Sequence, residues 1–203
     1  MFAVLGLTGG GSAHPSADQP SSAPEPTTSP SPTPSAAAPR ITPAPAKKVV
    51  AVADPMPRSV PTRLRIPAIG VDSNLMALGL KSDGTLQTPP GAFPAGWFTE
   101  APTPGELGPA IIVGHVRYNT PGVFARLTDL RRADEIDVRR EDGTTASFRV
   151  TRLEHFAKSQ FPTQMVYGNL DHAGLRLITC GGLDASTNEF KENVVVFADL
   201  VSQ

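Results

Sequence analysis

The chain has 203 residues, of which 39% are hydrophobic and 18% are charged, and its formal net charge at pH 7 is −1. This balance, with no basic stripe and no interleaved aromatic residues, excludes nucleic acid as an expected partner. The basic pairs Arg131–Arg132 and Arg139–Arg140 flank turn-rich sequence and are interpreted as solvated faces. One cysteine and a few scattered histidines provide neither a disulfide framework nor a zinc motif, so no metal or other cofactor is predicted.

Residues 1–11 form an apolar stub, which opens with Met1–Leu7. Such a run is too short to span a bilayer, which takes about 20 residues, and no basic residues precede it as they would in a signal peptide. The stub is therefore either an incidental apolar start or the remnant of a membrane anchor whose upstream half is missing. The spacer directly behind it favours the second interpretation.

Residues 12–59 have the composition of a disordered linker. Of the 22 prolines, 12 fall within the first 60 residues, and the stretch 12–45 consists almost entirely of Pro, Ser, Ala and Thr. Such a segment cannot bury enough apolar surface to offset the entropy lost on ordering, so we expect an extended Pro/Ser/Ala-rich spacer. The less proline-rich residues 47–60 are the part that could pack on the following domain.

Residues 60–203 have the pattern of one all-β domain, in which short apolar or alternating runs indicate strands. The expected strands are 63–66, 71–80, 110–116, 135–140, 145–156, 175–180 and 193–200, with a short helix over 123–130. Glu141–Thr144 contains Asp-Gly and indicates a hairpin turn. About seven or eight short strands with little helix predict a closed β-barrel or a sandwich.

Two reactive side chains stand at the ends of apolar runs in this domain. Cys180 closes the run 175–180 and is followed by two glycines, which would let a substrate backbone come close. His115 follows Gly114 at the end of the run that starts at Ala110. If the two strands are neighbours, the side chains can meet as a Cys–His catalytic pair. A lone cysteine is more often a small buried hydrophobe, and a lone histidine is usually structural, so both interpretations stay open at this point.

Several motifs, taken together, resemble the sortase family, and most closely its actinobacterial class F members. They occupy residues 94–98 (Pro-Ala-Gly-Trp-Phe), 104–109, 113–116 (Val-Gly-His-Val), 161–163, 166–168, 175–182 and 193–198. The match covers residues 61–203. The resemblance depends on the whole set, because Thr-Cys or Gly-His alone would be a weak signal.

This resemblance implies an eight-stranded β-barrel and a cysteine transpeptidase at the extracytoplasmic face of the cell membrane. Sortases cleave a C-terminal sorting signal of the Leu-Pro-x-Thr-Gly type between Thr and Gly, and they hold the acyl group as a thioester. The implied partners are surface proteins that carry the signal and an amine acceptor such as a peptidoglycan precursor. The membrane would be a further partner, through an N-terminal anchor, if the native chain is longer. By the matching motifs, Cys180 is the expected nucleophile and His115 the expected general acid and base.

The chain departs from the family pattern at the third catalytic position. Sortases carry an arginine near the start of the last strand, thought to stabilise the oxyanion or hold the substrate backbone, and here no arginine follows Arg176. Lys191 would keep the charge without the planar fork, whereas a different count along the strand places Asn193 there. Lys191 could also be a solvent-exposed loop residue. His155 and His172 lie outside the motifs and are interpreted as structural or surface residues.

Two other functions stay open. An L,D-transpeptidase also uses an exported cysteine and histidine, but its Ser-His-Gly-Cys cluster is absent from this chain. The missing arginine raises the alternative of a catalytically weak or inactive sortase-like module that only binds sorting signals. Covalent capture of a signal mimic at Cys180 would indicate an enzyme, and purely reversible binding would indicate a module.

Overall fold

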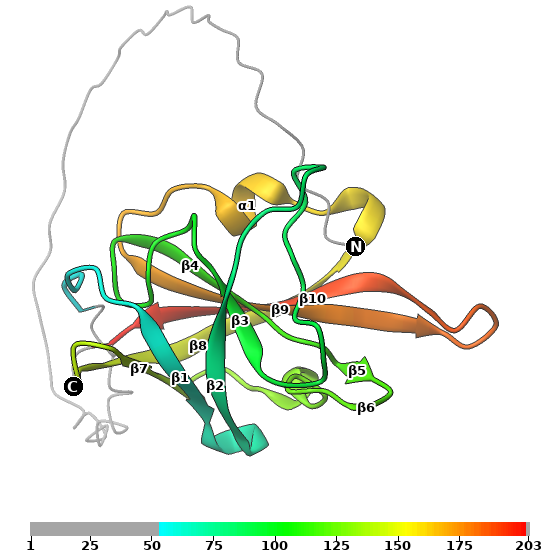
Figure 1. Ribbon diagram of the computed structural model, residues 1–203, viewed down its shortest axis with the longest axis horizontal. Coiled ribbons are helices and arrows are strands. Elements are labelled where there is room, and N and C mark those ends of the chain that lie inside the picture. Colours follow the sequence, from blue (N-terminus) through cyan, green and yellow to red (C-terminus); the bar gives the residue numbers. More distant parts are fainter. Residues whose placement is uncertain (1–52, 202–203) are drawn as a thin grey trace, which may run out of the picture. The chain divides into compact units, whose positions relative to one another are not determined.

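A computed structural model describes residues 53–201, whose strands close into a barrel (Figure 1). The barrel strands are β1 (Pro61–Ile66), β2 (Val71–Leu78), β3 (Ala95–Phe98), β4 (Gly108–Val113), β7 (Glu135–Arg140), β8 (Thr145–Ala157), β9 (Ala173–Asp184) and β10 (Glu189–Leu200). Their order around the barrel is β1-β2-β3-β4-β9-β10-β8-β7. The predicted closed eight-stranded barrel is therefore confirmed.

The remaining elements are short. Two-residue strands β5 (Arg117–Tyr118) and β6 (Thr120–Pro121) pair with each other after β4. There is one α-helix, α1 (Thr163–Tyr167), and there are 3-10 turns at Pro67–Ile69, Leu127–Asp129 and Lys158–Gln160. No helix within residues 53–201 is long and apolar enough to cross a membrane. The predicted stub and most of the predicted linker, residues 1–52, lie outside the described residues.

The helix predicted over residues 123–130 is wrong. Successive backbone N–H groups there bond to carbonyls three residues earlier, as in Leu127 to Phe124 and Leu130 to Leu127, which gives 3-10 turns instead of an α-helix. Only the turn Leu127–Asp129 is regular. The apolar spacing that indicated a helix comes from side chains buried in the barrel core, namely Val123, Phe124, Leu127 and Leu130.

Alternation along β4 and β9 divides the buried side chains into two layers. One layer fills the barrel and includes Ala110, Ile112, Leu175 and Leu177. The other lies on the outer face, where α1 covers it, and includes Ile111, Val113, Val166 and Ile178. Because both faces of these strands are buried, their sequences form continuous apolar runs.

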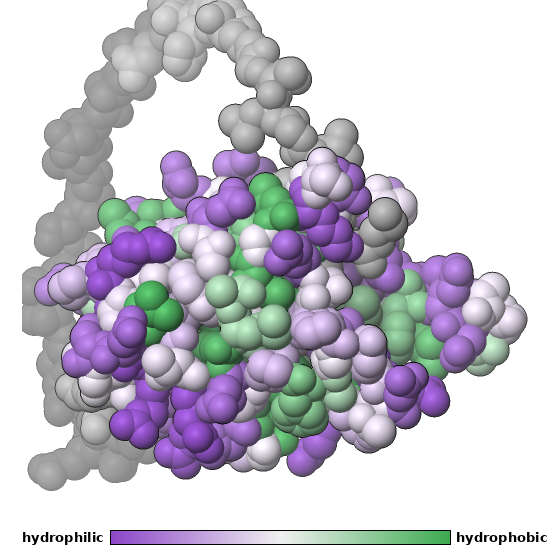
Figure 2. All heavy atoms as spheres, viewed as in Figure 1, coloured by the Kyte–Doolittle hydropathy of each residue, from purple (hydrophilic) through white to green (hydrophobic). Residues whose placement is uncertain are grey.

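The β9–β10 hairpin extends beyond the barrel (Figure 1). Pairing of β9 with β4 ends at Ile178, and pairing of β10 with β8 ends at Glu192, so the last part of the hairpin has no third strand beside it. Figure 2 shows apolar surface near the base of this hairpin and a polar tip. Cys180 therefore stands where the closed barrel ends and the free hairpin begins.

The predicted hairpin turn at Glu141–Thr144 is present between β7 and β8. The Asp142 carboxylate accepts hydrogen bonds from the backbone N–H and the hydroxyl of Thr144 at 2.9 and 2.7 Å. Gly143 has φ +83°, a left-handed conformation that glycine adopts without strain. The local chemistry of the turn thus agrees with its sequence signal.

Residues 53–59, which composition assigned to the linker, pack against the barrel and are called the strap below. Backbone hydrogen bonds join Ala53 to Leu200 at 3.1 Å and Met56 to Gly105 at 2.7 Å. The Ser59 N–H donates to the Thr103 hydroxyl at 3.2 Å. The packed chain therefore includes residues upstream of the expected boundary at residue 60.

Arg140 lies under the strap, and its predicted place on a solvated face is wrong. Its side chain is 0% exposed and is 3.6 Å from the Asp142 carboxylate. The guanidinium donates to the Pro57 carbonyl and contacts the Met56 sulfur at 3.1 Å. Alternation along β7 turns the neighbouring Arg139 to solvent, so a basic pair in sequence is divided between the two faces.

We predict that a chain beginning at residue 60 is less stable than one beginning at residue 53. The shorter chain loses the strap's backbone hydrogen bonds and the bond to Arg140, and each such bond is worth about 1 kcal/mol net. At about 2–4 °C per kcal/mol for a domain of this size, we expect the melting temperature to fall by about 5 °C.

The control is a pair of methionine substitutions at the two adjacent arginines. Arg140→Met should reduce the difference between the two chains, because the bond to Pro57 is then absent from both. The exposed Arg139→Met should leave the difference unchanged. Equal melting temperatures for the two unsubstituted chains would mean that the strap does not stabilise the barrel.

Candidate active site

The parallel pairing of β4 and β9 brings the residues that follow the two strands to the same level. Beyond the strand end, the Gly114 N–H donates to the Ile178 carbonyl at 3.1 Å, and the Thr179 hydroxyl donates to the Gly114 carbonyl at 2.8 Å. His115 and Cys180 come next on the two segments. His115 and Cys180 thus follow the last paired residues of β4 and β9, Val113 and Ile178, at the same end of the sheet.

Both side chains belong to the outer face of the barrel. Cys180 is two residues after Ile178, and it is half-buried at the edge of the outer cluster. Ile111 and Val113 of β4 belong to the outer cluster, and His115, two residues after Val113, continues the same alternation. The thiol is thus accessible at one edge and packed against apolar groups at the other.

Aromatic side chains line the apolar edge of this region. Phe156, Phe161 and Tyr167 pack against the outer cluster together with Cys180. The Phe156 and Phe161 rings are 6.1 Å apart, and the Phe161 and Tyr167 rings are 6.2 Å apart. Burial raises the pKa of Tyr167 to about 12, so its phenol is neutral at physiological pH. The wall beside the thiol is therefore apolar and uncharged.

His115 is held by two groups from loops. Its Nε2 lies 2.8 Å from the carbonyl oxygen of Pro89, in the loop between β2 and β3. Its ring also faces Tyr118 of β5, with the ring centroids 5.2 Å apart and the planes tilted by 43°. The imidazole therefore has a defined orientation at the end of β4.

Asn193 is the residue of β10 that pairs directly with Cys180. Its side chain is 2% exposed, and among residues 53–201 its buried Oδ1 has no hydrogen-bond partner. Lys191 lies two positions further along the same face, with a side chain that is 52% exposed and an ammonium bonded to the Glu189 carboxylate. The polar group directly across from the thiol is thus the Asn193 carboxamide.

Arg176 does not replace the arginine expected from the family. It lies on β9 itself, four residues before Cys180, which is about 13 Å along a strand. Its guanidinium is buried over the Phe197 ring at 4.6 Å, and Arg152 contacts the same ring at 3.7 Å. Burial lowers the pKa of Arg176 to about 10, against the opposing effect of the Asp199 carboxylate. Its role is to pack the outer face.

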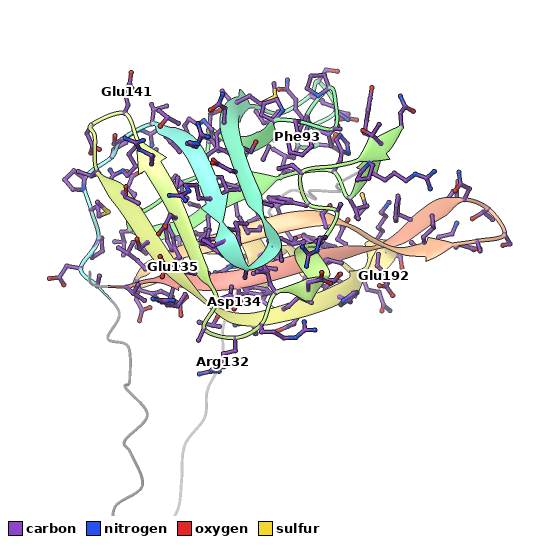
Figure 3. All side chains as sticks on the ribbon, turned by 90° about the horizontal axis from the view of Figure 1, so that it is seen from below. Phe93, Arg132, Asp134, Glu135, Glu141 and Glu192 are labelled. Carbon is purple, nitrogen blue, oxygen red and sulfur yellow. The ribbon has the colours of Figure 1, made fainter. Side chains whose placement is uncertain are left out.

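The two other histidines of the barrel are held by carboxylates. His155 of β8 lies 3.1 Å from Glu192, which Figure 3 labels on β10. Because β8 pairs Phe156 with Asn193, the adjacent His155 faces the side of the sheet opposite to Cys180. His172 lies between Asp171 at 2.8 Å and Asp199 at 3.2 Å. Within residues 53–201, no group of three His, Cys, Asp or Glu residues is arranged to hold a metal.

Sequence reasoning did not identify Pro89 or Tyr118. Pro89 contributes a backbone carbonyl, which has no side-chain signature in a sequence. Tyr118 is 44% exposed, and an aromatic residue three positions after His115 is the one signal that could have been used. Its contact with the histidine depends on the turn between β5 and β6, which the strand pattern did not predict.

The sortase domain family model matches residues 64–201. Solved structures with the same fold include a sortase D5 transpeptidase from Clostridium perfringens, with 22% identity over 71% of this chain and 79% of that one, at a TM-score of 0.53. A lid mutant of sortase A from Corynebacterium diphtheriae matches with 19% identity over 73% of each chain, at a TM-score of 0.56. Sortase C-1 from Actinomyces oris matches with 18% identity over 70% of this chain and 74% of that one, at a TM-score of 0.54. No curated protein shows a significant sequence match.

We predict that Gly114→Ala destabilises the barrel and disturbs the His115 region. A Cβ at this position would lie 2.5 Å from Val123 and 2.7 Å from the Phe124 ring, and both side chains are buried. Overpacking of this kind costs about 1–3 kcal/mol, so the melting temperature should fall by about 3–10 °C.

Gly79→Ala is the matched control for this substitution. The nearest atom to an added Cβ there is the Gln87 amide oxygen at 3.9 Å, which is an ordinary contact. Its melting temperature should stay within about 2 °C of the parent chain. If Gly114→Ala and Gly79→Ala have the same melting temperature, the packing argument for Gly114 fails.

Proposed function

The chain belongs to the sortase family, and on that premise we propose that it is a cysteine transpeptidase acting on a C-terminal sorting signal of the Leu-Pro-x-Thr-Gly type. The observation that carries the proposal is the parallel β4–β9 pairing, which supports a Cys180–His115 pair on one face of the barrel. Cys180 is the nucleophile, and His115 is the general acid and base.

In the acylation half-reaction, the Cys180 thiolate attacks the carbonyl carbon of the signal's threonine. A carbon–sulfur bond forms, and the carbon–nitrogen bond to glycine breaks as protonated His115 gives its proton to the departing amine. The product is a thioester on Cys180. A thiolate is needed because a neutral thiol is a weak nucleophile.

In the deacylation half-reaction, an incoming amine attacks the thioester carbonyl. The new carbon–nitrogen bond forms, the carbon–sulfur bond breaks, and the amine's proton passes to neutral His115. The enzyme returns to a thiolate and an imidazolium. One histidine thus serves both halves, and no metal or cofactor is needed to balance the reaction.

The outer face beside the pair suits an extended apolar peptide. The aromatic wall of Phe156, Phe161 and Tyr167 packs against the same outer cluster as Cys180. Further along β4, a cavity of about 400 Å³ is lined by apolar residues such as Phe98, Leu107 and Ile111 and by the polar residues Glu100 and Asn169. Leu and Pro side chains of a sorting signal could be accommodated along this face, which supports a peptide substrate.

Asn193 is our choice for the third position, and its role is to hold the substrate backbone. A buried acceptor without a partner is costly, about 1–3 kcal/mol, unless a bound molecule satisfies it. The Asn193 Oδ1 is such an acceptor, directly across from the nucleophile. A backbone N–H of the bound signal would satisfy it. Lys191 is the alternative, and it would have to leave Glu189 to take part.

The finer assignments follow from the sequence motifs. We propose class F membership from the residues around Trp97, His115 and Cys180, since the structural relatives share too little sequence to decide the class. We also propose that the protein acts at the extracytoplasmic face of the membrane. Its partners would be surface proteins with a sorting signal and an amine acceptor such as a peptidoglycan precursor.

The first prediction here concerns the nucleophile. Cys180→Ala should fold with an unchanged melting temperature within about 2 °C, yet lose all cleavage of a Leu-Pro-x-Thr-Gly peptide, because no other thiol is present in the chain. The intact protein incubated with the peptide should gain the mass of the acyl group, and the variant should not.

The outcome also separates the enzyme from the binding module. A module would bind the peptide reversibly and would show no covalent adduct in either protein. Residual turnover of even a few per cent in Cys180→Ala would overturn the assignment of the nucleophile.

The second prediction concerns Asn193. Asn193→Leu should lower kcat/KM by at least about tenfold, because the contact to the substrate backbone is lost. The same variant should melt about 2–4 °C higher, because a nearly isosteric apolar side chain removes the unpartnered acceptor from an apolar site.

Lys191→Met and Lys191→Arg are the comparisons for this test. If Asn193 has the proposed role, both lysine variants should keep kcat/KM within about twofold, because the lysine is exposed and paired with Glu189. A tenfold loss in Lys191→Met, restored in Lys191→Arg, would assign the role to the lysine instead.

A further inference from the structure

We infer that two loops form a clamp that fixes the tautomer of His115, so that its Nδ1 is the atom that exchanges protons during transpeptidation. The clamp consists of residues 86–92, between β2 and β3, and residues 116–124, which contain β5 and β6. This inference rests on the proposed function, since it names the ring atom that acts in that reaction.

The tautomer follows from the chemistry of the contact to Pro89. A carbonyl oxygen can only accept, so the hydrogen in the 2.8 Å contact belongs to Nε2 of His115. A neutral imidazole carries one hydrogen, and its Nδ1 then has a free lone pair. Within residues 53–201 the ring makes no other hydrogen bond. Nδ1 is therefore the atom left for Cys180 and the substrates.

The Pro89 carbonyl is a fixed acceptor, because its loop is tied down. Pro89 is buried, as is Leu86, which is 1% exposed. The Gln87 N–H donates to the Gly79 carbonyl at 3.0 Å, and the Gln87 side-chain oxygen accepts from the Gly79 N–H at 3.0 Å. These contacts close the base of the loop just before Pro89.

The second loop fixes the backbone of His115 itself. The His115 carbonyl accepts from the Phe124 N–H at 2.9 Å, and the Val116 carbonyl accepts from the Gly122 N–H at 3.0 Å. A further bond, from the Val123 N–H to the Ala92 carbonyl at 3.0 Å, joins this loop to the first one. The histidine and its acceptor thus belong to one hydrogen-bonded unit.

Gly122 and Tyr118 complete the clamp. A Cβ on Gly122 would lie 2.1 Å from the His115 carbonyl oxygen and 3.0 Å from the His115 Cβ, so the loop closes this tightly only around glycine. The Tyr118 ring, 5.2 Å from the imidazole, limits its rotation from another side. The ring is therefore held by its backbone, by Nε2 and by an aromatic contact.

A fixed ring has a consequence for the two half-reactions. In acylation, Nδ1–H gives its proton to the departing glycine amine, while Nε2–H stays hydrogen-bonded to the Pro89 carbonyl. In deacylation, Nδ1 takes the proton of the attacking amine as the carbon–sulfur bond breaks. The imidazole need not turn between the two steps, and the Pro89 carbonyl stabilises the imidazolium that is present before acylation and formed again in deacylation.

Nitrogen-15 NMR of the full chain labelled in its histidines tests the tautomer directly. The His115 signals are assigned by comparison with His115→Gln and followed to their high-pH plateau, where the ring is neutral. We expect the hydrogen-bearing shift at Nε2 and the unprotonated shift at Nδ1. The opposite pattern would overturn the inference, because the Pro89 carbonyl could not then be bonded to Nε2.

Two methylated histidines at position 115 test the role of each nitrogen. Nδ1-methylhistidine blocks the exchanging atom, and in its neutral form it also has no hydrogen on Nε2 to donate to the Pro89 carbonyl. The single-turnover rate of thioester formation should therefore fall by at least about 100-fold. Nε2-methylhistidine loses the bond but keeps Nδ1 free, and about a tenfold loss is expected. A larger loss from Nε2 methylation, in a variant that melts normally, would reverse the assignment.

Nδ1-methylhistidine at His172, which lies in the Asp171–Asp199 cluster, is the control and should leave the rate within about twofold. If the unsubstituted chain forms no thioester at all, the proposed function fails while the NMR result still decides the tautomer. If the chain is active and the NMR pattern is reversed, the clamp fails and the function stands.

Discussion

The parallel pairing of β4 with β9 is the constraint on which the proposed site depends. Parallel neighbours end at the same edge of a sheet, and they cannot be joined by a tight turn. Here the chain between them forms β7 and β8 before it returns, so the segments that carry His115 and Cys180 come to the same end of the sheet only when the barrel has closed. β9 is bound on one side by β4 and on the other by β10. The site is therefore a property of the whole barrel.

The points where strand pairing stops determine the environment of the thiol. β4 leaves β9 after Ile178, and β8 leaves β10 after Glu192, so Cys180 has strand neighbours on one flank and open space along the hairpin. This explains why the thiol is only half-buried although the preceding residues of β9 are fully buried. A buried thiol would be inert, and a fully exposed one would lack the apolar wall that suits a peptide.

The sequence predicted the strands well where burial imposes a pattern, and poorly where backbone groups decide the structure. The continuous runs of β4 and β9 are apolar because both faces are covered, and the Asp142–Gly143 turn has its own side-chain chemistry. β3, with only four residues, is too short to show a period. The lower proline content of residues 47–60 indicated that this part could pack. The strap is held mainly by backbone hydrogen bonds, however, so neither its contacts nor the burial of Arg140 was visible in composition. At the proposed site, the motifs predicted Cys180 and His115, whereas the Pro89 carbonyl left no mark in the sequence.

Two buried polar side chains, Arg140 and Asn193, differ in how far the fold satisfies them. Arg140 is completely covered, and the strap supplies a carbonyl and a sulfur to its guanidinium, although its Nε has no partner within residues 53–201. The Asn193 Oδ1 is equally covered but has no partner within residues 53–201, although an apolar residue of the same size would fit an apolar neighbourhood better. A fold gains nothing from such an acceptor, and its desolvation costs about 1–3 kcal/mol. A donor from outside the chain would recover this cost, and the residue across the strand pair from Asn193 is Cys180, the proposed nucleophile. In the proposed role, the same position lowers the stability of the free protein and improves its hold on a bound peptide backbone, which is the trade expected of a binding site rather than of a core.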